Sequence, residues 1–217
     1  MVNFTGVAAF GFALTLTGAS AMAADVAPAP APAKQNTISA EFGPEWKTTD
    51  GTLADDYVKF GYAHTFDNNV VLGTTFQYTW RPTNTSYDQL EAALGYKIKL
   101  DAFTLTPGVI LGYGFGDLPS INPAKGQGGD PEAYYAFAIA GDLKLDDHWT
   151  WNVFNARYRN AFDVTWITPK IATGITYKFD NSNAIYTNVG YAWKDTGNGK
   201  GLQPDKWNVA IGYRFSF

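Results

Sequence analysis

The stretch Leu90–Leu100, LEAALGYKIKL, places an apolar side chain at every second position and a small or charged one between them. Successive side chains of a β-strand point to opposite faces, so this pattern gives a strand two different environments. A helix would instead repeat its apolar residues every three or four positions. The stretch therefore predicts a strand with one apolar face and one face of glycine, alanine, lysine and glutamate.

The same period of two continues over the rest of the chain from Asn36 onward. Alternating runs start at Ile38, Val58 and Leu72. The other candidate strands are Phe103–Phe115, Ala133–Leu145, Trp149–Arg159, Ile167–Phe179, Ala184–Trp193 and Trp207–Phe217. One of them changes parity near Val153, where a β-bulge would keep its large side chains on one face. The pattern predicts about ten strands, the even number and length range of a small barrel.

The connections between these strands alternate between short and long. The short ones are Asp67–Asn69, Asp101–Ala102, Asp146–His148 and Asp180–Ser182, rich in Asp and Asn, which suit tight turns. The long ones are Lys47–Asp55, Arg81–Tyr87, Asp117–Pro131, Asn160–Thr165 and Lys194–Asp205. Outer-membrane barrels have this alternation, with the short turns in the periplasm. An even number of strands then places both ends of the barrel segment on the periplasmic side.

The strands of a soluble β-sandwich or barrel also alternate between apolar and polar side chains. The composition of the two faces must therefore distinguish a soluble β protein from a membrane barrel. In a soluble protein, the face opposite the large apolar side chains would meet water and be rich in Lys, Glu and Ser. In this sequence that face is rich in Gly, Ala and Thr. Its glycines are Gly61, Gly73, Gly95, Gly108, Gly112, Gly114, Gly174, Gly190 and Gly212. Glycine is usual where space is short, as in a narrow barrel interior.

The large face carries aromatic residues near both ends of the strands. Trp46, Trp80, Trp193 and Trp207 lie near the long loops, and Tyr62, Tyr96, Tyr177 and Tyr213 lie nearer the short turns. Such rings form the aromatic girdles of a membrane barrel. The predicted fold is all-β: an antiparallel, up-and-down transmembrane β-barrel.

The first residues differ from the rest of the chain. Val7–Leu16 is apolar and Ala21–Ala23 has the small-x-small form of a cleavage site, so residues 1–23 are predicted to be a signal peptide. Met1–Gly6 lacks the usual Lys or Arg, and a buried helix is the alternative. Residues 24–35 contain alternating prolines, which favour an extended periplasmic spacer. Residues 36–217 would form the barrel.

The last five residues, Tyr213-Arg214-Phe215-Ser216-Phe217, resemble the C-terminal signal of bacterial outer-membrane proteins. Tyr213, Phe215 and Phe217 are its alternating aromatics. The resemblance implies recognition by the barrel-assembly machinery of a Gram-negative bacterium, with outer-membrane lipid and lipopolysaccharide as the surroundings. The five residues indicate this class and no particular subfamily.

Few residues suit catalysis or cofactor binding. The chain has no Cys and two His, and its net charge of −4 gives no reason to expect nucleic acid. Asp147–His148 is similar to the Asp-His pair of the omptin proteases, but it lies in a predicted periplasmic turn. His64 falls on the lipid face, and neither His has a neighbour spaced for activation. Asp117, Asp130 and Glu132 would suit either a hard cation or a solvated loop. We predict no catalytic, cofactor or metal site, and a protease or lipid-modifying enzyme is the less favoured alternative.

The charges expected to face the lumen are the remaining feature. Of 16 Lys and Arg, eleven fall on that face: Lys59, Arg81, Lys97, Lys99, Lys144, Arg157, Arg159, Lys170, Lys178, Lys206 and Arg214. The acids there are Glu41, Glu45, Glu91 and Asp142. A basic lumen would focus anions, and the small oligogalacturonate porins have a similarly basic interior. Alternatively, the bases pair with these acids and with turn aspartates and plug the barrel.

These observations favour a monomeric, non-enzymatic outer-membrane barrel that is a surface or structural component. A narrow channel that prefers anions is compatible with this function. A small-solute porin for anionic substrates is the alternative.

Overall fold

The alternating stretches pair into one closed sheet in a computed structural model, which describes residues 35–116, 131–195, 197 and 199–217. The predicted signal peptide, nearly all of the spacer and most of the loop Asp117–Pro131 lie outside the described residues. The strands are β1 (Asn36–Lys47), β2 (Leu53–Thr65), β3 (Val70–Trp80), β4 (Ser86–Tyr96), β5 (Ile98–Leu100), β6 (Phe103–Gly116), β7 (Glu132–Lys144), β8 (Trp149–Ala161), β9 (Lys170–Lys178), β10 (Asn183–Lys194) and β11 (Gln203–Ser216). In these residues, no helix is long and apolar enough to cross a membrane.

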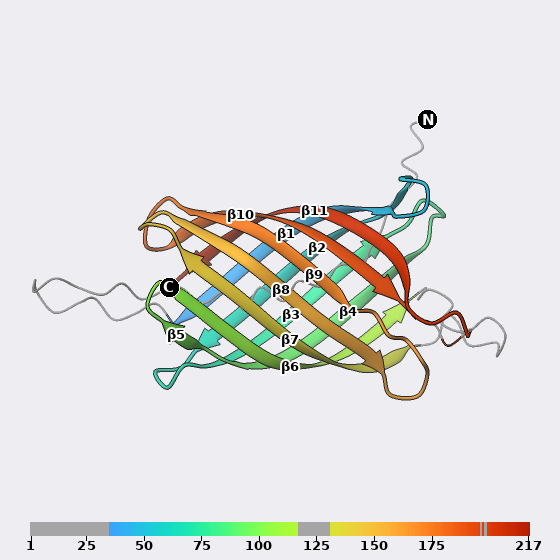
Figure 1. The fold of residues 1–217 in the computed structure, drawn as a ribbon, viewed down its shortest axis with the longest axis horizontal. Coiled ribbons are helices and arrows are strands. Elements are labelled where there is room, and N and C mark those ends of the chain that lie inside the picture. Colours follow the sequence, from blue (N-terminus) through green and yellow to red (C-terminus); the bar gives the residue numbers. More distant parts are fainter. Residues whose placement is uncertain (1–34, 117–130, 196, 198) are drawn as a thin grey trace, which may run out of the picture.

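Each strand pairs antiparallel with its neighbours around a complete ring. β1 pairs with β11, and β4 pairs with β6, so the sheet has no free edge. The short β5 also pairs with β6 and continues β4 after an interruption at Lys97. The result is a closed barrel of 10 strands, as predicted. Figure 1 shows the strands running obliquely to the long axis of the barrel.

The two ends of the barrel differ in their connections. We call the end with the short connections the turn end; it also holds Asn36 and Phe217, whose backbones are hydrogen-bonded. Tight turns form there because Asp carboxylates accept backbone N–H groups. The Asp146 carboxylate accepts from His148 and Trp149, each at 2.7 Å. We call the opposite end, with the long connections, the loop end. In Figure 1 the C-terminus and β5 lie together at the turn end.

Several strands extend further into the predicted loops than the pattern indicated. β2 begins at Leu53 and β11 at Gln203, because backbone pairing continues beyond the last large side chain. The predicted strand Ile167–Phe179 is shorter and begins at Lys170. Pro169 has no N–H for a ladder, and Ile167 forms only an isolated bridge with Asp195.

The two faces of the sheet are as different as the pattern predicted. Phe60 is 54% exposed on the outer surface, whereas the neighbouring Lys59 is 4% exposed inside the barrel. The predicted bulge in β8 is confirmed: the register shifts between Asn152 and Asn155. On the outer surface, Trp46 and Trp207 stack at 4.4 Å near the loop end. This arrangement leaves a narrow interior to be filled by polar and small side chains.

Candidate functional site

The interior of the barrel is the candidate site, and its first repeated feature is a tyrosine lying on a glycine. Tyr134 is directly opposite Gly112 in the sheet register, and Tyr186 is directly opposite Gly212. Tyr57 faces Gly43 in the same way, and a Cβ added at Gly43 would lie 2.7 Å from the ring. These rings occupy the space that a side chain would need. Gly112 and Gly212, two of the glycines predicted to mark a crowded interior, therefore accommodate interior tyrosines, and Gly43 does the same. The pattern analysis missed these tyrosines.

Each of these tyrosines also faces a cation. The Arg159 guanidinium lies 5.0 Å from the Tyr134 ring, and that of Arg214 lies 4.8 Å from the Tyr186 ring. Lys59 lies 5.7 Å from the ring of Tyr57. A fourth pair, Arg81 on Tyr87, has a separation of 4.6 Å. Cation–π contacts away from water contribute about 2 kcal/mol, so the rings offset part of the cost of burying these charges.

Glu91 connects strands that are not neighbours in the sheet. Its carboxylate on β4 accepts a hydrogen bond from Arg157 on β8 at 3.2 Å and one from Tyr134 on β7 at 2.7 Å. Strand β6 lies between β4 and β7, so these bonds cross the interior. Both members of the Glu91–Arg157 ion pair are almost completely buried.

A second set of charges joins β1 to its neighbour β11 and to the more distant β9. Glu45 lies 3.6 Å from Lys170 on β9 and 3.7 Å from Lys206 on β11. Lys206 also pairs with Asp55 on β2. Deeper inside, Glu41 pairs with Lys59 and accepts a hydrogen bond from the Tyr57 hydroxyl at 2.9 Å. Pairing of this kind offsets part of the cost of burying these charges.

The loop between β8 and β9 places a tryptophan in the interior at the loop end. Trp166 from this loop is buried, and its ring lies 5.7 Å from Tyr134 and 4.0 Å from the Arg159 guanidinium. Arg159 is completely buried between the two rings, and its Nε donates to Thr168 Oγ1 at 2.7 Å. The Trp166 backbone N–H donates to Asn160. These contacts fix the loop in the mouth of the barrel.

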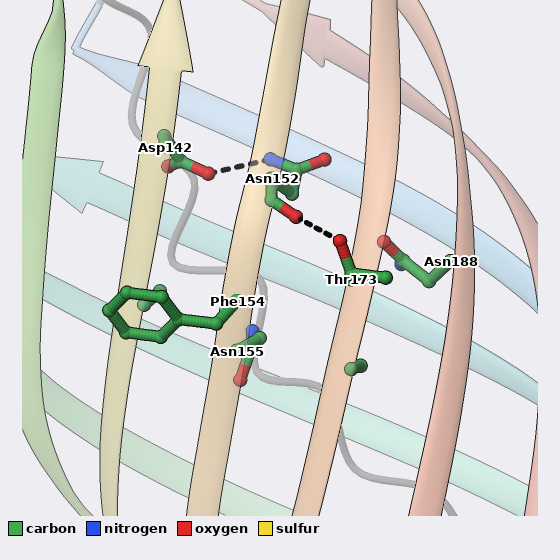
Figure 2. A pocket seen from close by; sticks show the side chains of 8 residues that line it. Asp142, Asn152, Phe154, Asn155, Thr173 and Asn188 are labelled. Carbon is green, nitrogen blue, oxygen red and sulfur yellow. Dashed lines mark hydrogen bonds between the residues drawn. The ribbon is translucent and has the colours of Figure 1, made fainter.

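Near the turn end, polar side chains surround a small cavity. Its volume is about 10 Å³, the space of about one water molecule. Figure 2 shows the Asn152 side-chain amide donating a hydrogen bond of 2.6 Å to the Asp142 carboxylate. It also shows the Thr173 hydroxyl donating a hydrogen bond to the Asn152 backbone carbonyl. Asn188 lies on the other side. A cavity of this size holds a water molecule but not a solute.

The structure places most of the predicted lumen charges inside the barrel. Lys59, Lys97, Arg157, Arg159, Lys170 and Arg214 are buried with Glu91, and Arg81 is half-buried. Lys99 differs from expectation, because β5 lies at the outer limit of the turn end and leaves this side chain exposed. Asp55, predicted to lie in a loop, is buried in β2. Among the described residues, six buried cations face five buried acids, and four more of the predicted cations are half-buried: Arg81, Lys144, Lys178 and Lys206.

The expected pairing of lysines with turn aspartates occurs once in the described turns. Lys144 pairs with Asp147 at 2.8 Å. Asp146 and Asp180 instead accept backbone N–H groups of their own turns. Lys97 donates to the Thr65 hydroxyl at 3.0 Å.

The two histidines lie apart from any catalytic arrangement in the described residues. His148 Nδ1 contacts the Lys178 carbonyl oxygen at 2.9 Å, and His64 Nδ1 contacts the Asn36 side chain at 2.9 Å. No group of three His, Asp or Glu side chains suited to a metal ion occurs in the same part of the chain. Glu132 is described, but Asp117 and Asp130, the other members of the loop cluster, are not.

The residues of the C-terminal motif lie on β11 at the turn end. Tyr213 and Phe217 are exposed on the outer surface, and the rings of Phe215 and Phe217 stack at 5.9 Å. The Tyr213 hydroxyl contacts the Asn183 side chain on β10. The motif therefore forms part of the aromatic belt of the turn end.

Known proteins resemble this chain in structure only. No family model and no curated protein matches it. The β domain of the Bordetella autotransporter BrkA matches with a TM-score of 0.51 and 11% identity, covering 85% of this chain and 100% of that one. An outer-membrane channel of Pseudomonas putida matches with a TM-score of 0.50 and 10% identity, and the match covers 90% of this chain and 100% of that one. The KdgM porin matches with a TM-score of 0.42 and 16% identity, and the match covers 82% of this chain and 99% of that one.

Identities this low establish the fold alone. The closed ten-stranded antiparallel ring, its apolar outer face and the two structural relatives with TM-scores of 0.51 and 0.50 agree. This chain has the fold of a small outer-membrane β-barrel.

Proposed function

We propose that this chain is a non-enzymatic barrel of the Gram-negative outer membrane that serves as a structural or surface component with a closed interior. The bond from Arg157 to Glu91 across the interior carries this proposal. It occupies the space a solute would need, and the buried Trp166 covers the loop end of the same region. A barrel of about ten strands has little interior space beyond that filled by side chains.

The outer surface of the barrel supports a membrane as its surroundings. Phe60, Leu111 and Phe137 are among the exposed apolar residues, and hydrocarbon is the solvent that suits them. Outer-membrane lipid and lipopolysaccharide are the proposed contacts, with the turn end in the periplasm. The proposed assembly partner is the barrel-assembly machinery, and the proposed state is a monomer.

The absence of enzymatic activity is part of the proposal. An activated nucleophile requires a base within hydrogen-bond reach. Among the described residues, neither the His64 imidazole nor the His148 imidazole hydrogen-bonds to a carboxylate or a serine.

Single-channel recording in planar bilayers tests the closed interior. Folded wild-type protein should give no stable conductance. A variant with Glu91→Ala, Arg157→Ala and Trp166→Ala should conduct, because it loses both the cross-interior bond and the loop-end cover. The matched control, Lys194→Ala with Asp205→Ala, removes an ion pair at the surface and should remain silent. Steady conductance of the wild type would contradict the proposal.

A small-solute porin for anions is the second candidate, because the interior holds several cations near each other. Arg157 and Lys170, for instance, are directly opposite in the register. If the wild type does conduct, changing Arg157 and Arg159 to Ser should lower anion selectivity at low salt. The effect should weaken as salt rises, since the Debye length is about 10 Å at 0.1 M. Cation selectivity of the wild type would reject this candidate.

A further inference from the structure

Three cations gather inside the turn end of the barrel. Lys97 is 4% exposed, Arg214 on β11 is 8% exposed, and Lys178 on β9 is half-buried. Lys97 and Lys178 each interact electrostatically with Arg214 and with the other. Lys97 follows β4, which lies on the other side of the ring from β9 and β11, so the three side chains face one another across the interior. We call these three side chains the turn-end cation cluster.

One buried acid accompanies the cluster among the described residues. Asp142 interacts electrostatically with all three cations. One of its oxygens already accepts the Asn152 amide at 2.6 Å. No ion pair joins the cluster to a carboxylate anywhere in the described chain. The nearby turn carboxylates bond to the turn backbones or to Lys144. Lys97 and Arg214 are thus two buried cations beside one buried acid, which leaves an excess of positive charge inside this end of the barrel.

The cluster also has hydrogen-bond donors to offer. Arg214 Nη2 is buried and has no hydrogen-bond partner in the described residues, while the guanidinium carbon lies 4.8 Å from the centre of the Tyr186 ring. Lys97 uses one of its three donors on the Thr65 hydroxyl at 3.0 Å. A guanidinium edge and ammonium groups are the donors that bind oxyanions, because each bond is assisted by charge. A buried charge without a counter-charge costs several kcal/mol, which an anion would offset.

We infer that the turn-end cation cluster is a binding site for a small free oxyanion such as inorganic phosphate. The half-buried Lys178 and Lys144 mark the side from which the ion enters. A lipid phosphate is not the source, because Lys97 and Arg214 lie on the interior face of the barrel, opposite to the face that contacts lipid. The cluster lies at the opposite end of the barrel from Trp166. A failure to bind phosphate would therefore not contradict the proposed closed interior.

Phosphate binding by the refolded barrel in a phosphate-free detergent tests the inference. ³¹P line broadening of inorganic phosphate and the thermal midpoint would be measured at constant ionic strength. The wild type should show saturable broadening, and its midpoint should rise with phosphate, because a ligand that binds only the folded state stabilises it. Arg214→Gln and Lys97→Gln should each lower the affinity at least tenfold. Arg214→Lys should keep part of it.

Lys99→Gln is the matched control, since Lys99 lies at the same end but is exposed. Lys99 interacts electrostatically with Lys97, but its ammonium group is exposed to water, so Lys99→Gln should weaken phosphate binding far less than Lys97→Gln. Lys178→Gln supplies a third variant should Arg214→Gln fold poorly, because it leaves the Tyr186 contact intact. The site is rejected if wild-type broadening is absent, if it does not saturate, or if Lys99→Gln weakens it as much as Lys97→Gln. Equal stabilisation of all folded variants by phosphate would also reject it, since that result reports general screening.

Discussion

At the scale of single residues, the interior depends on contacts between the largest and the smallest side chains. Tyr186 lies on Gly212, which leaves the ring no room to move toward the backbone. The ring is then fixed beneath Arg214, and a flat aromatic surface replaces water around that charge. Glycine is therefore required here because of the tyrosine opposite, although its own backbone conformation is ordinary.

Replacing Gly212 with Ala should destabilise the barrel by about 1–3 kcal/mol, the usual cost of overpacking. The added methyl group would collide with the Tyr186 ring. Unfolding in urea from lipid vesicles measures the change. The double variant Gly212→Ala with Tyr186→Val should lose less than the sum of the single variants. Simple additivity would mean that the two residues do not interact.

Asp146 predicts a dependence on pH at one turn. Hydrogen bonds from the Trp149 and His148 N–H groups hold the pKa of this carboxyl below its ordinary value. A carboxyl with a lowered pKa in the folded state stabilises above its unfolded pKa, near 3.9, and loses this effect as pH falls through the folded value. Asp146→Ala should therefore unfold at a lower temperature than the wild type at pH 7. The difference should shrink below about pH 4.

Thermal unfolding between pH 2 and pH 7 would test this turn. Asp163→Ala, at an exposed loop position, should show no such pH-dependent difference. A gap between Asp146→Ala and the wild type that is constant over this range would contradict the assignment to the carboxylate.

At the scale of elements, the difference between the two barrel ends predicts an orientation. Tags inserted within Asp117–Pro131 or Lys194–Asp205 should be accessible on intact cells, because these are long loops. Tags at Asp67–Asn69 or Asp180–Ser182 should be protected until the outer membrane is permeabilised. Labelling of the short-turn tags on intact cells would show that the orientation is opposite to the predicted one.

The final strand should matter more for assembly than for the finished barrel. Phe217 is exposed on the outer surface and contacts Phe215, so its removal deletes few interior contacts. Deleting Phe217 should therefore increase the protease-sensitive, periplasmic fraction in cells, while purified protein refolds close to the wild-type level. Changing Phe179, another exposed aromatic at the turn end, to Ala is the control. Normal insertion of the shortened chain would refute a role in recognition.

The strands and their faces could be predicted from the sequence, because alternation depends only on each residue and its near neighbours. The bulge in β8 was predictable for the same reason, since Val153 marks a change of parity. Strand ends were less predictable: Leu53 and Gln203 pair beyond the apolar pattern. The inward position of Trp166 was not predictable, since it depends on Arg159 and Tyr134 being brought together by the closed sheet.

At the scale of the whole molecule, the buried ion pairs connect distant parts of the ring. Glu91→Ala should destabilise the barrel by about 3–5 kcal/mol, because Arg157 is left buried without its carboxylate. The double variant Glu91→Leu with Arg157→Leu should lose much less, since no uncompensated charge remains. Denaturant unfolding measures both.

The control for this prediction is the pair Lys194 and Asp205 at the barrel surface. Removing either partner there should change stability by about 0–1 kcal/mol, as for most exposed pairs. A similar small effect for Glu91→Ala would mean that water reaches the interior pair.

The seam between β1 and β11 has a consequence for how this chain folds. It joins residues as far apart in sequence as Asn36 and Phe217, with a separation of 181. Contacts of such high contact order form slowly, because a long loop must close before they stabilise anything. Until they form, β1 and β11 are both free edges, which attract strands of other chains. Folding is therefore completed only after β11 is available to pair with β1, and the unfinished chain requires protection from aggregation over that whole interval.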